Sequence, residues 1–148
     1  MEQSPPIDMQ RDIMENDLKE RKMKIVVNDD KKISTIQQEF SDLFPYLKLV
    51  FFEKAPKIGG LSAKIIAKYL DKTIEQYSTI RHTETLTITP QMTVADLKHG
   101  FNDIFGIHIQ VFRESGKAWL DATITEGWTL DEQNRQGKAL SEKEVKKS

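Results

Sequence analysis

Cysteine is missing from all 148 residues of the chain. Its absence excludes disulfide bonds, a thiolate nucleophile and every zinc site that needs sulfur ligands. No stretch approaches the roughly 20 apolar residues that a membrane-spanning helix needs, and the start has no apolar core of signal-peptide length. The formal net charge of -1 lacks the positive excess of proteins that coat nucleic acid or anionic membranes. We therefore expect a cytoplasmic protein that does not bind membranes and has little affinity for nucleic acid.

Catalytic and metal-binding motifs are absent as well. The sequence contains no GxSxG, no P-loop and no HExxH. The three histidines, His82, His99 and His108, are not spaced to ligate one metal ion. We expect no cofactor, no metal site and no enzymatic activity.

What the chain does contain is the composition of a globular domain, with 38% hydrophobic and 30% charged residues. Pro5-Pro6 and sparse apolar residues set residues 1–22 apart as a flexible leader with a weak helix. We expect a single α+β domain over residues 23–137. Residues 138–148 are rich in charge and short of large apolar side chains, which predicts a flexible tail.

The central part of the chain repeats its apolar pattern. "FSDLF" at Phe40 recurs as "FNDIF" at Phe101, and aligning Lys24–Lys54 with Thr85–Ser115 places apolar residues on apolar residues. Each copy predicts a strand, a helix and a second strand, with Pro45 and Gly106 at the same helix-stop position. The alternating second strands match when the second copy is one residue shorter after the stop, since a one-residue shift would turn the apolar face outward.

The repeat extends to residues 24–78 and 85–134. Thr73 with Gln76, and Thr129 with Glu132, are spaced as capping boxes, each of which would begin a short helix. Before the second box, "RESGK" predicts a hairpin turn between two strands. Before the first box, residues 61–72 fit a helix by periodicity but a strand by analogy with the second copy; we favour the helix.

The strands decide the fold class. "TLTIT" and "HIQVF" carry a polar residue at alternate positions, whereas strands covered on both faces are apolar throughout. We expect one sheet with one open face, in a two-layer α+β sandwich built from two duplicated strand-helix-strand units, ferredoxin-like or a pair of β-grasp-like units, followed by a C-terminal hairpin and a short helix.

The block "TVADLKHGFNDIFGIHIQVFRESGKAWLDATITEGWTLDEQNRQG" at Thr93–Gly137, together with "FPYLKLVFF" at Phe44–Phe52, resembles a family of small uncharacterised bacterial cytoplasmic proteins. The family has no established activity. The resemblance implies one coherent fold and a bacterial cytoplasmic setting.

The stretch "KAPKIGGLSAK" is a candidate anion site. If a helix begins near residue 61, its free amides and the neighbouring lysines would favour phosphate or carboxylate. Lysines spaced by four would line one side of that helix, which is also what a solvated helix face looks like. The residues concerned are Lys57, Gly59, Gly60, Ser62, Lys64, Lys68 and Lys72.

The hairpin over residues 107–125 is the second candidate. Alternation places Trp119 on the polar face with Asp121, which is unusual for so large an aromatic residue. Arg113, across the turn, would stack on Trp119, and both residue types are enriched at binding hot spots. Alternatively, the helix that begins at Thr129 folds back to cover Trp119, with Trp128 as its hydrophobic staple.

Two functions fit these patterns. The first is a non-catalytic protein-interaction module, with homodimerisation included, that uses an open sheet face and a partner-binding set of Arg113, Trp119 and Trp128. The alternative is weak, salt-sensitive binding of an anion or nucleic acid by the lysines of residues 57–72.

Overall fold

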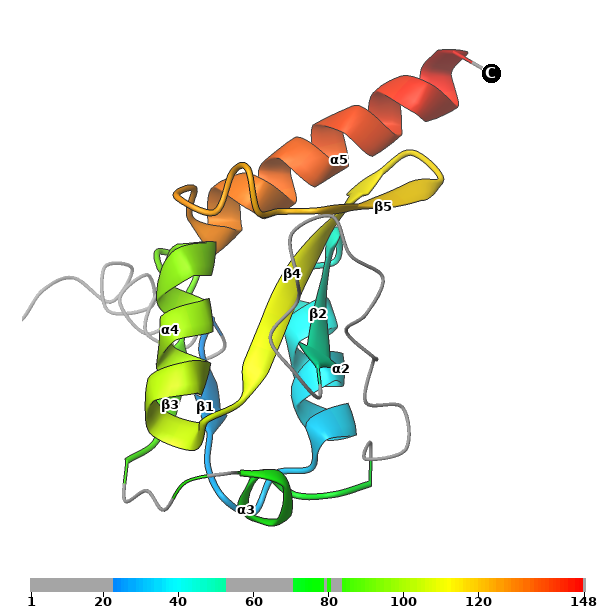
Figure 1. Cartoon of the computed structure of the whole chain (residues 1–148). Coiled ribbons are helices and arrows are strands. Elements are labelled where there is room, and N and C mark those ends of the chain that lie inside the picture. The colour runs from blue at the N-terminus through cyan, green and yellow to red at the C-terminus, as the bar shows by residue number, and fades with distance from the viewer. Residues whose placement is uncertain (1–22, 53–70, 79, 81–83, 148) are drawn as a thin grey trace, which may run out of the picture.

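Alternating apolar residues form the strands and apolar residues spaced by three and four form the helices. The computed structural model describes residues 23–52, 71–78, 80 and 84–147. The elements in chain order (Figure 1) are β1 (Ile25–Val27), α2 (Ile33–Leu43), β2 (Leu47–Phe52), α3 (Ile74–Tyr77), β3 (Leu86–Ile88), α4 (Val94–Phe105), β4 (His108–Ser115), β5 (Ala118–Asp121) and α5 (Leu130–Lys147). The predicted leader and residues 61–70 of the segment that fits either a helix or a strand lie outside the described residues. Asp71 and Lys72, the last two residues of that segment, belong to neither a helix nor a strand.

The strands form two antiparallel sheets. β1 pairs with β3, and the second sheet has the order β2-β4-β5. The predicted α+β class and two-layer arrangement are confirmed, but the expected single sheet is wrong. The physical reason is that each strand of the first unit pairs with its counterpart in the second unit, so that β1 and β3 separate from β2 and β4.

Local signals set the ends of the helices. α2 ends at Leu43, just before Pro45, and Gly106 caps α4 in the left-handed conformation with φ 66°, as the two stop residues predicted. The predicted capping box of Thr73 and Gln76 is present at α3. α4 begins with a further capping box, in which the Thr93 hydroxyl accepts a hydrogen bond from the Asp96 amide at 3.0 Å.

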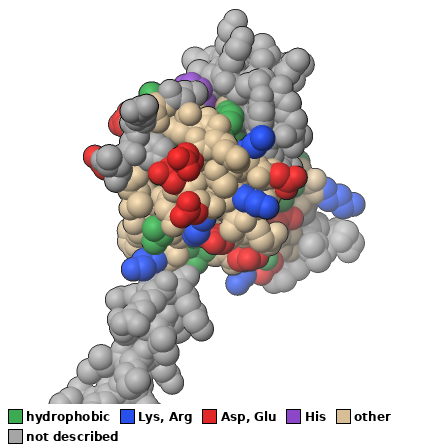
Figure 2. Space-filling view, turned by 90° about the horizontal axis from the view of Figure 1, so that it is seen from below, with side chains coloured by type: hydrophobic (Ala, Val, Ile, Leu, Met, Phe, Trp, Pro, Cys, Tyr) green, Lys and Arg blue, Asp and Glu red, His purple; other side chains and the backbone are tan. Residues whose placement is uncertain are grey.

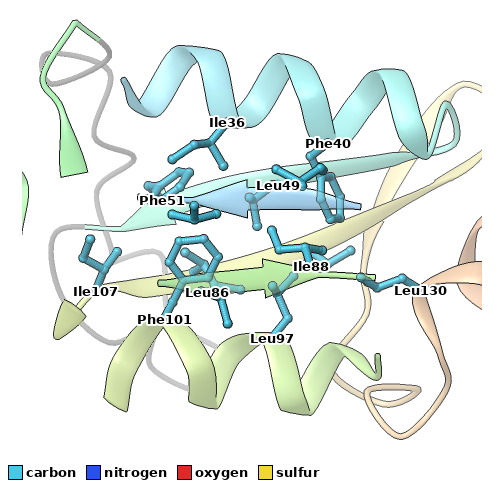
Figure 3. Close-up of a cluster of buried hydrophobic side chains, with 14 of the residues drawn as sticks. Ile36, Phe40, Leu49, Phe51, Leu86, Ile88, Leu97, Phe101, Ile107 and Leu130 are labelled. Atoms are coloured by element: carbon cyan, nitrogen blue, oxygen red, sulfur yellow. The ribbon is translucent and has the colours of Figure 1, made fainter. Parts of the chain in front are cut away.

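The core lies between α2 and α4, which flank it on opposite sides (Figure 3). Phe40 of α2 and Phe101 of α4, the repeated phenylalanines, are both fully buried. Phe101 also meets Phe51 of β2 edge to face, with ring centroids 5.5 Å apart. Strands and helices of both units therefore share one apolar cluster.

The two units make matching contacts. Lys32 and Thr73 form an isolated bridge, and so do Thr93 and Thr129. Two backbone hydrogen bonds flank each bridge, from Ile33 to Lys72 and from Ile74 to Lys31 in the first, and from Val94 to Trp128 and from Leu130 to Met92 in the second. Each strand ladder contains one pair of residues that are equivalent in the alignment, Val26–Thr87 in the first ladder and Val50–Gln110 in the second. These contacts fit a duplication, which stays a prediction.

α5 is the largest departure from the sequence prediction. The expected short helix runs for 18 residues and includes the segment predicted as a flexible tail. Gly137, where we placed the end of the domain, lies inside α5 and is buried. A Cβ atom there would lie 2.9 Å from Cβ of Tyr46 and 3.1 Å from Cγ of Arg113, so glycine allows α5 to approach β4 closely.

The expected open face is present only in parts. Val26 and Thr87 on the outer side of β1 and β3 are exposed. On the outer side of β2 and β4, by contrast, Val50, Phe52 and Gln110 are buried. Gln110 is polar yet buried because its side chain is hydrogen-bonded: its amide donates to Thr123 at 2.9 Å and its carbonyl accepts from Val111 at 3.0 Å. An alternating polar residue is therefore not by itself a sign of exposure.

Candidate interaction surface

The candidate surface lies on the β4–β5 hairpin. Gly116, with φ 62°, and Lys117 form the two-residue turn, and the left-handed φ is one that glycine adopts without strain. β5 is the outer strand of its sheet (Figure 1). All four of its residues are exposed. The predicted hairpin is thus confirmed, and it ends the sheet in an uncovered strand.

One side of the hairpin carries a mixed aromatic and charged surface, which we call the hairpin face. Cross-strand pairing puts its members on the side of the sheet that faces away from the core. They are Lys48, Phe112, Glu114, Trp119 and Asp121. Trp119 is 41% exposed. Lys48 Nζ lies 4.9 Å from the centroid of the Trp119 ring and 5.9 Å from that of Phe112, within range of a cation–π interaction.

Arg113 does not take part in this surface. Its cross-strand partner is Leu120. Its side chain therefore points to the side of the sheet opposite to that of Trp119. The predicted stacking of Arg113 on Trp119 is therefore wrong, and Lys48 occupies that place. Sequence reasoning missed Lys48 because the pairing of β2 with β4 follows from tertiary structure, although the alternation of "LKLVFF" marks Lys48 as outward-facing.

Arg113 and Trp128 instead join α5 to the sheet. The Arg113 guanidinium lies 5.4 Å from the Trp128 ring centroid, and its Nη1 donates to Gln133 Oε1 at 2.8 Å. Gln133, fully buried in α5, donates in turn to the carbonyl of Thr125 at 2.6 Å. Two of the three predicted partner-binding residues thus belong to a structural network, although Trp128 keeps 40% of its surface exposed.

The alternative in which α5 covers Trp119 is also wrong. α5 packs on the Arg113 side of β4, where Gly137 meets Arg113. Its Ser141 hydroxyl accepts a hydrogen bond from the Gly116 amide at 3.3 Å. At the start of α5, the Glu132 amide donates to the Thr129 hydroxyl at 3.1 Å, which is half of the predicted capping box. α5 therefore supports the hairpin from one side and leaves Trp119 on the other.

A small polar cluster ends β5. The amide and the hydroxyl of Thr123 both donate to Asp121 Oδ1, and the Thr123 hydroxyl also accepts from Gln110. These bonds turn the chain away from the ladder directly after Asp121. The strand is therefore short, and its last residue is held in place.

The candidate anion site falls almost entirely outside the described residues. Lys57, Gly59, Gly60, Ser62, Lys64 and Lys68 belong to residues 53–70, so the site stays a prediction. Lys72 is described and is exposed just before the cap of α3. On the face seen from below in Figure 2, acidic and basic side chains lie intermingled rather than gathered by sign.

The described residues contain no group of three or more histidine or acidic side chains that could hold a metal ion. His99 lies exposed on α4 and His108 half-buried on β4, while His82 is outside the described residues. Within the described part of the chain, no helix has the length and apolar character to cross a membrane.

No protein-family model, no curated protein and no solved structure matches the chain.

Proposed function

We propose that the protein is a non-catalytic protein-interaction module that binds through the hairpin face, with Trp119 at its centre. The single observation that carries this proposal is the position of Trp119. It stands 41% exposed on an outer strand, turned away from the core and from α5.

The exposed part of Trp119 is large enough to matter for affinity. A buried tryptophan removes up to about 250 Å² from water, so covering the remaining 41% would bury roughly 100 Å². At about 25 cal/mol per Å² this is worth roughly 2.5 kcal/mol, or nearly two powers of ten in Kd. Tryptophans of this kind are the residues that dominate alanine scans of interfaces.

The surroundings of Trp119 suit a protein partner better than an anion. Lys48 carries positive charge next to the ring, while Glu114 and Asp121 carry negative charge on the same face. An aromatic centre with charges of both signs around it resembles the apolar core and polar rim of protein interfaces. Nucleic-acid surfaces instead gather lysine and arginine on one face.

The proposal can be tested by capturing partners on the immobilised full-length chain from the cells that produce it. We expect one or more proteins to be retained at about 0.5 M salt, where binding through phosphate contacts is strongly weakened. Trp119→Ala should lose them. Ile124→Ala is the matched control, because Ile124 is 98% exposed on the turn after β5 and supports no packing. Retention unchanged by Trp119→Ala would contradict the proposal, and retention of nucleic acid that is lost with salt would favour the lysine alternative.

A further inference from the structure

The outer edge of β5 presents backbone groups that no described strand uses. The Glu114 amide donates to the Tyr46 carbonyl at 2.9 Å, toward β2, so Glu114 and its cross-strand partner Trp119 form a non-hydrogen-bonded pair. The Ala122 amide donates to the Val111 carbonyl at 3.0 Å, which fixes the same alternation at the far end. The N–H and C=O groups of Trp119 and Asp121 therefore point away from β4, toward the edge.

The side chains along this edge are complementary to themselves. In an antiparallel pairing of two β5 strands around a twofold axis at Trp119, Lys117 of one copy lies opposite Asp121 of the other, twice. Ala118 then lies opposite Leu120, a small residue against a large one, on the α5 side. Directly opposed opposite charges stabilise a strand pair, whereas like charges destabilise it.

Other registers lose this match. An axis at Lys117 would place two lysines face to face, and an axis at Asp121 would place two aspartates face to face. An axis at Ala118 or Leu120 would leave both charges without an opposite partner. Charged residues commonly protect edge strands from unspecific pairing. In β5 and its turn, Lys117 and Asp121 favour one register, the one centred on Trp119.

We propose that β5 pairs with β5 of a second copy of this chain, antiparallel and centred on Trp119, to form a continuous six-stranded sheet. This inference rests on the proposed function and names its partner. The two Trp119 residues exchange a pair of backbone hydrogen bonds, and their side chains lie next to one another on the joined hairpin faces. Because β5 has only four residues, the contact is small, and the dimer forms and dissociates with concentration.

The absence of cysteine permits a direct test of the axis. In a hydrogen-bonded antiparallel pair the two Cα atoms are about 5.5 Å apart, close enough for a short bifunctional thiol reagent to link two cysteines. We expect such a reagent to cross-link Trp119→Cys in the full chain into a covalent dimer at least tenfold faster than Ile124→Cys. Ile124→Cys is the control for random collision, because position 124 is more exposed. Equal rates for the two variants would overturn the proposal.

Charge reversal tests the register without removing Trp119. Lys117→Asp and Asp121→Lys should each reduce the dimer fraction in sedimentation equilibrium, because each places like charges opposite one another twice. A mixture of the two variants should regain a dimer, because every opposed pair is then of opposite charge. This rescue cannot come from a folding defect in either variant. Failure of the mixture to associate, when the wild-type chain does, would overturn the register.

The outcomes separate this inference from the proposed function. A wild-type chain that stays monomeric up to about 1 mM overturns self-pairing. If Trp119→Ala still abolishes capture of another protein in that case, the proposed function stands and only its partner is different. If the chain is monomeric and capture does not depend on Trp119, both proposals fail.

Discussion

At the scale of single residues, Gly137 is the position that permits the packing of α5. Glycine inside a helix costs about 1 kcal/mol relative to alanine. The structure tolerates this cost because a side chain at position 137 would press against Cβ and the main-chain oxygen of Tyr46, at 2.9 and 3.2 Å. The contact holds α5 against the base of the hairpin.

We expect Gly137→Ala to lower the free energy of unfolding. Overpacking costs about 1–3 kcal/mol, which outweighs the gain of roughly 1 kcal/mol in helix propensity, for a net loss of up to about 2 kcal/mol. Urea unfolding followed by circular dichroism would measure it. Gly127→Ala is the matched control, since nothing lies within 4 Å of a Cβ atom there. A Gly137→Ala chain as stable as the control would contradict the close packing of α5.

Sequence reasoning succeeded where the signal is contained in a few neighbouring residues. Pro45, Gly106 and the pair Thr73–Gln76 act on their own helix ends, and each does what its chemistry predicts. The end of the domain was wrongly placed at Gly137 because residues 138–148 have few large apolar side chains, although α5 continues to Lys147. The close contact of Gly137 with Tyr46, 91 residues earlier in the chain, depends on tertiary structure.

At the scale of elements, the equivalent helices α2 and α4 differ at their first residue. Thr93 caps α4 with its side chain, whereas Lys32 stands at the cap of α2 and makes no side-chain cap hydrogen bond. The backbone at Lys32 is extended, with φ -76° and ψ 150°, close to that at Thr93. The backbone of Lys32 therefore already has the conformation that an N-cap residue adopts.

We expect the two caps to respond in opposite directions to substitution. Thr93→Ala should lower the free energy of unfolding by about 1 kcal/mol, because the Asp96 amide loses its acceptor. Lys32→Thr should raise it by up to about 1 kcal/mol, because a hydroxyl becomes available to the first turn of α2. Thermal unfolding of the two variants would measure both. A loss of stability in Lys32→Thr would show that the two helix starts are not equivalent.

The hairpin shows which part of the candidate site could be predicted from the sequence. Alternation along β5 correctly separates Trp119 from Leu120. The alternation does not show which strands pair with one another. The sequence therefore led to the prediction that Arg113 stacks on Trp119, and it gave no sign that Lys48 does so. The burial of Gln110 was not predicted for a related reason. Its hydrogen bond to Thr123 depends on where the chain turns after β5, and its carbonyl accepts a further bond from Val111.

At the scale of the whole molecule, two sheets and the helices α2 and α4 enclose one core. α5 supports the hairpin that extends from this core (Figure 1). The apolar periodicity predicted the strand-helix-strand elements of both units and the buried Phe40 and Phe101, but not the burial of Val50, Phe52 and Gln110 on the outward side. It did not predict two sheets, because the same alternation serves a strand in either arrangement. That choice depends on pairing between the two units, as in Ile25 with Ile88 and Val50 with Gln110.

The architecture leaves β5 as the exposed end of the larger sheet, and association through this edge is the central claim. Amide hydrogen exchange of the full chain at low and high concentration tests it most directly. We expect the Leu120 amide, which faces β4, to exchange slowly at both concentrations. The Trp119 and Asp121 amides should exchange fast in dilute solution and become protected as the concentration rises. Trp119 and Asp121 amides that exchange at the same rate at every concentration would contradict the claim.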